Sequence, residues 1–335
     1  MQSAIYGLSG LALTPDERAF FRDADPAGYI LFHRNCADRG QLRALTDDLR
    51  SLHGRDDLPI LIDQEGGRVA RMKPPVWPAF PKAQAFADLY QKAPMSAIEA
   101  ARANAQALAA MLVECGVNVD CLPLLDVRQP GANDIIGDRA LGNEPMQVAA
   151  LGRAVLEGLK AGGVVGVVKH IPGHGRSMAD SHLELPVVPV GEAELETDLE
   201  PFRTLNTAPM AMTAHVVYTA WDGERCASLS ATVIHDIIRT RIGFDGLLMS
   251  DDIGMHALTG GFDQRTRGVL DAGNDLALHC SGDMAEMVAV ATAAHQLTGK
   301  GLERLERAMA TIGGAPSPEP YAELAAKRDS LLSYA

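Results

Sequence analysis

The chain has 335 residues, of which 47% are hydrophobic and 22% charged, and its formal net charge is −13 at pH 7. This length and composition allow a large buried core and exclude a disordered chain. An acidic balance of this size gives no sign of a basic surface for a nucleic-acid backbone or an anionic membrane. We therefore expect no nucleic-acid partner and no membrane partner.

The first residues lack the charged region and the apolar core of a signal peptide, and no later apolar run is long enough to span a bilayer. These features predict a soluble, cytoplasmic protein. The five cysteines are scattered and contain no C-x-x-C pair, so they indicate neither a disulfide framework nor a zinc knuckle. We expect them to be buried thiols.

Short runs rich in β-branched residues or leucine alternate with longer helical patterns along the whole chain, as in parallel β/α units. Eight such runs are present, at residues 4–7, 28–32, 59–62, 117–123, 164–169, 209–215, 246–250 and 275–279. Two of the helical segments between them begin with a predicted capping box, Thr14 with Glu17 and Ser96 with Glu99.

Eight predicted strands fit a (β/α)8 barrel, which needs roughly 250 residues before insertions. An open, doubly wound sheet for dinucleotides is less consistent with the sequence, because no Gly-x-Gly-x-x-Gly motif follows the first strand. No linker or internal repeat divides the chain, and the proline-rich segment 73–78 has the character of a rigid loop. The predicted fold class is α/β, with residues 1–335 forming a single TIM-type barrel domain.

Polar residues follow four of the predicted strands, at the ends where barrel enzymes carry their chemistry. They are Asp63, Lys169 with His170, His215, and Asp251 with Asp252. Any one of them could simply mark a chain leaving the core, but four at one rim indicate a site. Because neighbouring side chains of a strand point to opposite sides, we expect only one of the two aspartates to face the barrel axis. Their spacing does not say which.

The segment from Lys169 to Gly175 is a glycine-containing loop that continues to Asp180 and His182. A carboxylate two residues from an imidazole can orient that ring and raise its basicity, which suits proton transfer near neutral pH. The alternative is that Asp180 caps a turn and His182 is an exposed loop residue.

A metal site at this loop is an alternative, because His170, His174, Asp180 and His182 are all ligand types that zinc accepts. Pro172 and Gly173 lie between the first two histidines, so these cannot share a helix face as an H-E-x-x-H pair does. We therefore predict no metal and no cofactor.

Several stretches, in this order, are similar to one enzyme family. They are residues 62–69 (IDQEGGRV) with Arg71, 136–139 (IGDR), 169–175 (KHIPGHG), 179–182 (ADSH), 212–216 (MTAHV) and 250–252 (SDD). Together they resemble the bacterial β-N-acetylglucosaminidases of glycoside hydrolase family 3. Small departures from the family's pattern are Ile171, where the family usually has Phe, and Ile253-Gly254, where Leu-Ser is common.

The resemblance implies a single barrel and assigns roles to residues. The nucleophile would be Asp251, the acid/base His182, and its partner Asp180. The N-acetylglucosamine ring would be held by Asp63, Arg71, Arg139, Lys169 and His170. From charge alone, each arginine could equally form a surface salt bridge of little energetic value.

These assignments predict a retaining mechanism, in which one carboxylate attacks the anomeric carbon and an acid protonates the leaving oxygen. The substrate would be a small glycoside: by resemblance a muropeptide fragment, N-acetylglucosamine β-linked to anhydro-N-acetylmuramic acid with or without peptide, or a chitobiose-like glycoside. Two alternatives stay open. A histidine acid/base does not repel an anion, so phosphate could replace water in a phosphorylase, and a sugar-binding barrel without catalysis is the second alternative.

Overall fold

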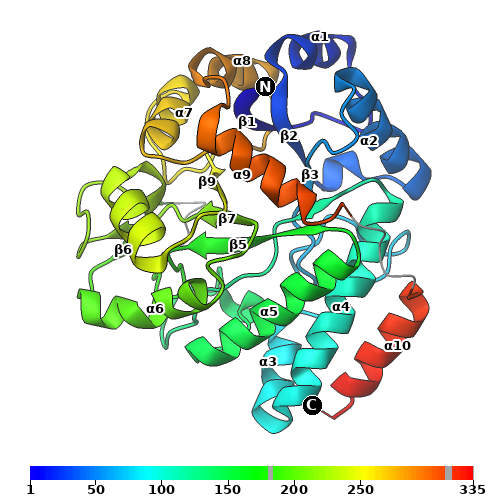
Figure 1. The fold of residues 1–335 in the computed structure, drawn as a ribbon, viewed down its shortest axis with the longest axis vertical. Helices are drawn as coiled ribbons and strands as arrows, with labels where there is room; N and C mark the ends of the chain where they lie inside the picture. The colour runs from blue at the N-terminus through cyan, green and yellow to red at the C-terminus, as the bar shows by residue number, and fades with distance from the viewer. Residues whose placement is uncertain (180–183, 314–318, 335) are drawn as a thin grey trace.

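The computed structural model describes residues 1–179, 184–313 and 319–334. Eight parallel strands form a closed barrel in the order β1-β10-β9-β7-β5-β4-β3-β2 (Figure 1). Strand β1 pairs with both β2 and β10, so the first and last strands close the barrel. The barrel strands are β1 (Gln2–Gly7), β2 (Pro26–Leu31), β3 (Ile60–Ile62), β4 (Val119–Asp120), β5 (Val165–Ile171), β7 (Met210–Thr213), β9 (Leu247–Asp252) and β10 (Leu276–His279). The predicted (β/α)8 fold is confirmed.

All eight predicted strands are present, but their ends differ from the predicted ones. Strand β4 has two residues, whereas β5 extends to Ile171 because Ile171 still pairs with Thr213 of β7. Strand β9 likewise extends through Asp252. The polar residues Lys169, His170 and Asp251 therefore lie within the last residues of strands, and the backbone pairing of the barrel fixes their positions.

Helices surround the barrel, and α10 packs beside α4 although the two are far apart in the sequence (Figure 1). The α-helices are α1 (Pro15–Ala24), α2 (Arg39–His53), α3 (Ala83–Lys92), α4 (Pro94–Glu114), α5 (Pro145–Ala161), α6 (Glu192–Thr204), α7 (Phe262–Asp271), α8 (Met284–Ala293), α9 (Gly299–Ala310) and α10 (Tyr321–Leu332). A π-helix, η4 (Val233–Ile242), precedes β9. Shorter elements are the 3-10 turns η1 (His33–Asn35), η2 (Gly137–Arg139) and η3 (Ala227–Leu229), and a small parallel sheet of β6 (Val187–Val188) and β8 (Val217–Tyr218).

One of the two predicted capping boxes is confirmed and the other is wrong. At α1, the Thr14 hydroxyl accepts the Glu17 N–H, and the Glu17 carboxylate accepts the Thr14 N–H at 2.9 Å. Helix α4 instead begins at Pro94. Proline has the backbone angle of a first helical residue and needs no amide partner there, so the helix starts two residues before Ser96.

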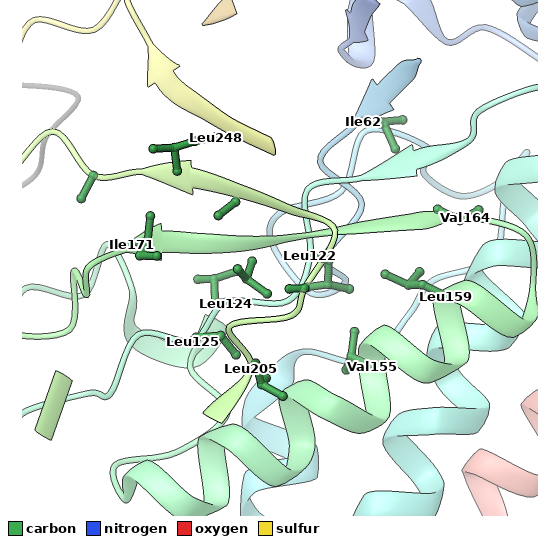
Figure 2. Close-up of a cluster of buried hydrophobic side chains, with 14 of the residues drawn as sticks. Ile62, Leu122, Leu124, Leu125, Val155, Leu159, Val164, Ile171, Leu205 and Leu248 are labelled. Carbon is green, nitrogen blue, oxygen red and sulfur yellow. The ribbon is translucent and has the colours of Figure 1, made fainter. Parts of the chain in front are cut away.

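Two hydrophobic layers hold the fold together, and the alternation of side chains along each strand separates them. Ile5, for example, belongs to the cluster inside the barrel, while its neighbours Ala4 and Tyr6 belong to the cluster beneath the helices. Figure 2 shows part of the outer layer, where Val155 and Leu159 of α5 face the barrel. All five cysteines are buried free thiols, as predicted. In the described part of the chain, no helix is long and apolar enough to cross a membrane.

Candidate active site

A cavity of about 370 Å³ lies at the C-terminal ends of the barrel strands, where (β/α)8 enzymes place their active sites. The described residues predicted for the site all line it: Asp63, Arg71, Arg139, Lys169, His170 and Asp251. A larger hollow of about 750 Å³ lies at the opposite end, beside the segments that lead into β3, β4 and β5, and none of these six residues lines it. The cavity at the C-terminal ends is therefore the candidate site.

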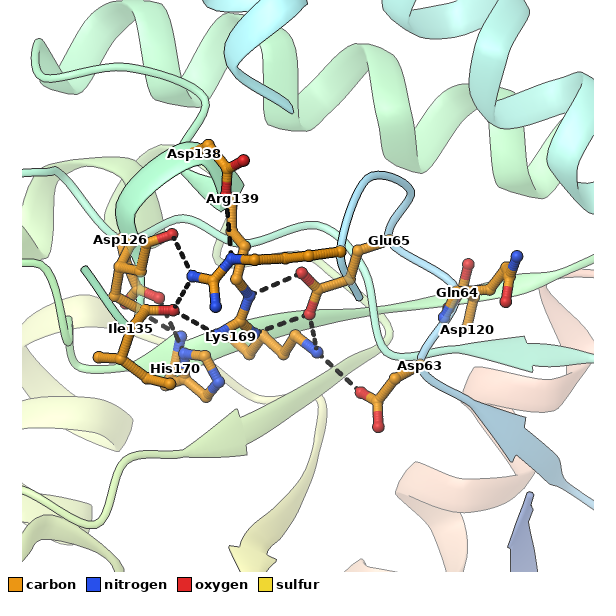
Figure 3. Close-up of polar contacts among 12 residues, drawn as sticks. Asp63, Gln64, Glu65, Asp120, Asp126, Ile135, Asp138, Arg139, Lys169 and His170 are labelled. Atoms are coloured by element: carbon orange, nitrogen blue, oxygen red, sulfur yellow. Dashed lines mark hydrogen bonds and ion pairs between the residues drawn. The ribbon is translucent and has the colours of Figure 1, made fainter. Parts of the chain in front are cut away.

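One wall of the cavity is a row of alternating charges (Figure 3). Lys169 donates a hydrogen bond from Nζ to Asp63 Oδ1 at 2.9 Å, and its Nζ lies 2.7 Å from Glu65 Oε1. Arg139 donates from Nε and Nη2 to the two oxygens of Glu65, each at 2.8 Å. At the other end, Arg71 donates from Nη2 to Asp63 Oδ2 at 3.1 Å. The Arg139–Glu65 contact is bidentate and buried, so the surface salt bridge considered for Arg139 is excluded.

The charges in this row keep each other ionised in spite of their burial. Burial by itself lowers the pKa of Lys169, but the carboxylates of Asp63 and Glu65 raise it above the usual lysine value. Burial likewise opposes ionisation of Asp63, but Lys169 and Arg71 hold its pKa below the usual range. Lys169 Nζ donates to Asp63 and pairs with Glu65. The row is thus rigid before a ligand arrives and still offers donors and acceptors to sugar hydroxyls.

The side chain of Gln64 holds the loop that carries Arg71. Its Oε1 accepts the backbone N–H groups of Arg71 at 2.8 Å and Met72 at 3.0 Å, and its Nε2 donates to the Met72 carbonyl at 2.9 Å. The Gln64 N–H in turn donates to Asp120 Oδ1. Burial raises the pKa of Asp120 well above its usual value.

His170 is oriented by Asp126, which follows β4 in the sequence. The His170 Nδ1 lies 2.8 Å from Asp126 Oδ2, and a carboxylate only accepts, so this nitrogen carries the hydrogen. Asp126 also accepts the backbone N–H groups of His170 and His174. Burial alone would raise the pKa of Asp126, but His170 and these bonds lower it to about 2. The charged carboxylate therefore fixes the ring of His170 at the cavity wall.

Asp251 and Asp252 both line the cavity, although we expected only one of them to face the barrel axis. The pairing of β9 with β10 changes register here, because Met249 and Asp252 lie opposite Leu276 and Leu278. Between these two pairs, β9 advances by three residues and β10 by two, as in a β-bulge. The extra residue breaks the regular alternation of side chains along β9. Asp252 Oδ1 accepts the Gly254 N–H at 2.9 Å. Asp252 thus has the structural hydrogen bond expected of one member of the pair.

A family model described as the glycosyl hydrolase family 3 N terminal domain matches residues 8–312. The chain belongs to glycosyl hydrolase family 3. A β-hexosaminidase of Alkalilimnicola ehrlichii is 39% identical over 280 residues, which is 82% of this chain and 79% of that protein. One from Bordetella pertussis is 38% identical over 286 residues, which is 83% of this chain and 80% of that protein. The predicted glycoside hydrolase and its resemblance to the hexosaminidase branch are confirmed.

The solved structures agree with this family membership. Native NagZ from Neisseria gonorrhoeae superposes with a TM-score of 0.80 at 30% identity, covering 99% of this chain and 97% of that one. The same protein has been solved with N-trifluoroacetyl-D-glucosamine and with a zinc ion. Among the described residues of this family 3 hydrolase, no group of three or more His, Cys, Asp or Glu side chains could hold a metal.

The predicted acid/base pair, Asp180 and His182, lies outside the described residues. The base of their loop is described and is firmly held. The Gly173 carbonyl accepts a hydrogen bond from the Tyr218 hydroxyl at 2.6 Å, and Arg176 pairs with Asp198 of α6. A side-chain carbon at Gly175 would lie 2.0 Å from the Val127 carbonyl oxygen, so only glycine fits there.

Sequence reasoning missed three residues that shape this family 3 site: Glu65, Asp126 and Gln64. Signals for two of them were present. Asp126 directly follows the apolar pair Leu124-Leu125, and Glu65 lies two residues after Asp63. Glu65 satisfies the rule that selected the other candidates, a polar residue just after a strand, whereas Asp126 lies beyond the end of β4 at Asp120 and follows only an apolar pair. No pattern in the sequence indicates that Glu65 bridges Lys169 and Arg139, because that contact joins three separate segments.

Proposed function

We propose that this family 3 hydrolase is a retaining exo-β-N-acetylglucosaminidase with Asp251 as its nucleophile. The observation that carries the proposal is the position of Asp251 at the end of β9, in the cavity whose wall is formed by the charged row of Asp63, Lys169 and Glu65. A cavity of about 370 Å³ is near the lower end of the roughly 300–1,000 Å³ typical of ligand pockets. It suits one terminal sugar ring.

The sugar specificity is supported by the relatives. Those reported above are named β-hexosaminidases, and the NagZ neighbour was solved with N-trifluoroacetyl-D-glucosamine. In this chain, Asp63 can accept hydrogen bonds from sugar hydroxyls, while Arg71 and Lys169 can donate them. Such charge-assisted bonds fix the ring, which orients its anomeric carbon toward the nucleophile.

In the proposed reaction, the Asp251 carboxylate attacks the anomeric carbon and forms a covalent glycosyl-aspartate, while the bond to the leaving oxygen breaks. The imidazolium of His182 gives its proton to that oxygen, and Asp180 stabilises the charged ring. The neutral His182 then takes a proton from water, which attacks the same carbon and releases Asp251. Two inversions give net retention of configuration.

The first experiment compares a chromogenic β-N-acetylglucosaminide with the matching β-glucoside in the presence of chelator. The variants are Asp251→Asn, His182→Ala and, as a control in an exposed ion pair, Asp47→Asn. We expect selective cleavage of the N-acetylglucosaminide, loss of activity in Asp251→Asn, a strong reduction in His182→Ala and no change in Asp47→Asn. Activity that survives Asp251→Asn, or that chelator removes, contradicts the proposal.

The covalent step has its own test. With an activated dinitrophenyl glycoside, His182→Ala should form the adduct faster than it hydrolyses it, so the sugar accumulates on the peptide that contains residues 247–254 and is detected by mass spectrometry. Added inorganic phosphate distinguishes the phosphorylase alternative, since glycosyl phosphate would appear as product. A burst of product without any sugar-bearing peptide would contradict Asp251 as nucleophile.

We further propose that the natural substrate is a muropeptide fragment, N-acetylglucosamine β-linked to anhydro-N-acetylmuramic acid with or without peptide. The proposal rests on the resemblance to the cell-wall recycling branch of the family and on the relatives named above. It is tested by comparing kcat/KM for this disaccharide and for chitobiose. A clear preference for chitobiose would overturn the muropeptide assignment and leave the glycosidase assignment intact.

A further inference from the structure

A buried histidine lies behind the proposed nucleophile and belongs neither to the cavity lining nor to the sugar-binding row. His215 follows β7, has a relative exposure of 0% and is not among the residues that line the cavity. A fully buried polar side chain must find partners or lose stability. The partners of His215 lie in two other segments of the chain, the end of β9 and the turn η3.

The hydrogen bonds of His215 fix its orientation and its proton. Its Nε2 lies 3.0 Å from the backbone carbonyl oxygen of Asp252, and a carbonyl only accepts, so Nε2 carries a hydrogen. Its Nδ1 lies 2.7 Å from Ser228 Oγ, which lies 3.3 Å from Cys226 Sγ. In the neutral ring, the thiol donates to the hydroxyl, the hydroxyl donates to Nδ1, and Nε2 donates to Asp252. Each donor in this series of hydrogen bonds therefore has an acceptor.

These contacts hold the backbone that carries Asp251. The peptide between Asp252 and Ile253 is held at both ends, since its carbonyl accepts from His215 and its N–H donates to the Leu278 carbonyl at 2.9 Å. The Asp252 N–H donates to Asp251 Oδ1 at 2.8 Å. This short path connects the imidazole to the nucleophile: His215 fixes Asp252, and Asp252 orients the Asp251 carboxylate.

Ser228, which bonds to His215 Nδ1, is also held in place. The Ser228 N–H donates to the Ala214 carbonyl at 3.2 Å, and Asn274 Nδ2 donates to the Ser228 carbonyl at 2.9 Å. Asn274 is itself held through its Oδ1, which accepts from the Thr213 hydroxyl at 3.1 Å. Strand β7, the turn η3 and the segment before β10 thus support His215 from behind, so the ring cannot turn away from β9.

The titratable groups that face His215 are Asp251, Asp252 and Cys226. Burial by itself lowers the pKa of His215. Hydrogen bonding with the Cys226 side chain and the charge of Asp251 raise that pKa above the usual histidine value. Burial raises the pKa of Asp252, and Asp251 raises it further. When His215 is protonated, Nδ1 donates to Ser228 Oγ instead, and the positive charge favours the ionised form of the carboxylates beside the ring.

We propose that His215, held by Ser228, is a positioning residue that fixes the end of β9 so that the Asp251 carboxylate faces the anomeric carbon. The inference rests on the proposed role of Asp251 as nucleophile. His215 does not line the cavity, so its effect is transmitted through the Asp252 backbone. A displacement of a reacting group by about 1 Å costs roughly 100-fold in rate.

The test uses three variants of the full chain. His215→Phe removes both ring nitrogens, and His215→Gln retains an N–H near the position of Nε2. Ser228→Ala removes the donor to Nδ1 and leaves the histidine in place. The matched control is His53→Gln, because the His53 side chain is also buried, with 4% exposure, and is hydrogen-bonded to Tyr29 at the other end of the barrel.

We expect kcat on the chromogenic N-acetylglucosaminide to fall about 10- to 100-fold in His215→Phe, with KM changed by less than about twofold because the charged row is intact. His215→Gln should recover part of kcat, and Ser228→Ala should lose less than His215→Phe. The acid limb of the pH profile of kcat/KM should move to higher pH in His215→Gln, and His53→Gln should behave as wild type.

Two outcomes overturn the inference. The first is wild-type kcat in folded His215→Phe, judged by circular dichroism and urea denaturation. If that variant does not fold, the result for His215→Gln decides: an unmoved acid limb together with an unchanged kcat refutes the positioning role. Failure of the proposed function is distinguishable, because in that case Asp251→Asn itself retains activity.

Discussion

Glu65 is the residue whose removal tests the charged row most directly. Its carboxylate accepts two hydrogen bonds from Arg139 at 2.8 Å and lies 2.7 Å from Lys169 Nζ. Glu65→Gln keeps the shape of the side chain but removes the negative charge. Lys169 then keeps Asp63 as its anion. Arg139 then keeps its hydrogen bond from Nη1 to the Ile135 carbonyl at 3.0 Å.

The expected loss of stability is large because Arg139 loses its carboxylate partner while it stays buried beside Lys169. The Lys169 side chain is 2% exposed and that of Arg139 is 10% exposed. Removing one partner of a buried ion pair leaves an uncompensated charge, which costs about 3–5 kcal/mol. The matched control is Asp47→Asn, which breaks an exposed i, i+4 pair with Arg43. Such a pair is worth about 0.3–0.5 kcal/mol.

The assay is urea denaturation followed by circular dichroism, which gives the free energy of unfolding of wild type, Glu65→Gln and Asp47→Asn. KM for the N-acetylglucosaminide should rise in Glu65→Gln, since Lys169 and Arg139 lose the group that orients them. A Glu65→Gln protein within about 1 kcal/mol of wild type would falsify the reasoning, because uncompensated buried charges cost more than that.

Two further predictions concern the backbone and pH. At Gly66, φ is +94° and an added side-chain carbon would lie 2.3 Å from the Pro81 carbonyl oxygen; Gly66→Ala should therefore destabilise the protein by more than about 1 kcal/mol. Thermal denaturation compares this variant with Gly10→Ala, where nothing lies within 4 Å of an added side-chain carbon. Gly10→Ala should melt at the wild-type temperature, and a Gly66→Ala protein with the same melting temperature as Gly10→Ala would contradict the argument. Burial lowers the pKa of His174 to about 4; stability from its neutral form is present above pH 6.5 and is lost as the pH falls toward 4. The free energy of unfolding should fall by up to about 1.4 kcal/mol per pH unit across this window, and His174→Gln should have a flatter slope; identical slopes would refute the assignment.

The sequence by itself determined the fold and predicted the place of the candidate site. Eight apolar runs alternating with helical patterns are sufficient to predict a (β/α)8 barrel, because strand and helix periodicities are local properties of the chain. A polar residue at the end of a strand is also a local signal, and it indicated Asp63, Lys169 and the pair Asp251 and Asp252, whereas the choice of Asp251 came from the family resemblance. The predicted capping box at Thr14 is confirmed. The one predicted at Ser96 is wrong, because Pro94 starts the helix earlier.

Only the tertiary structure decided how the site residues act on each other. Glu65 bridges Lys169 and Arg139 because three loops meet at one end of the barrel, and no pattern within a single segment reports such a contact. The change of register between β9 and β10 likewise places both Asp251 and Asp252 at the cavity. Local sequence specifies which face of a strand a side chain occupies, whereas the pairing of neighbouring strands decides where that face points.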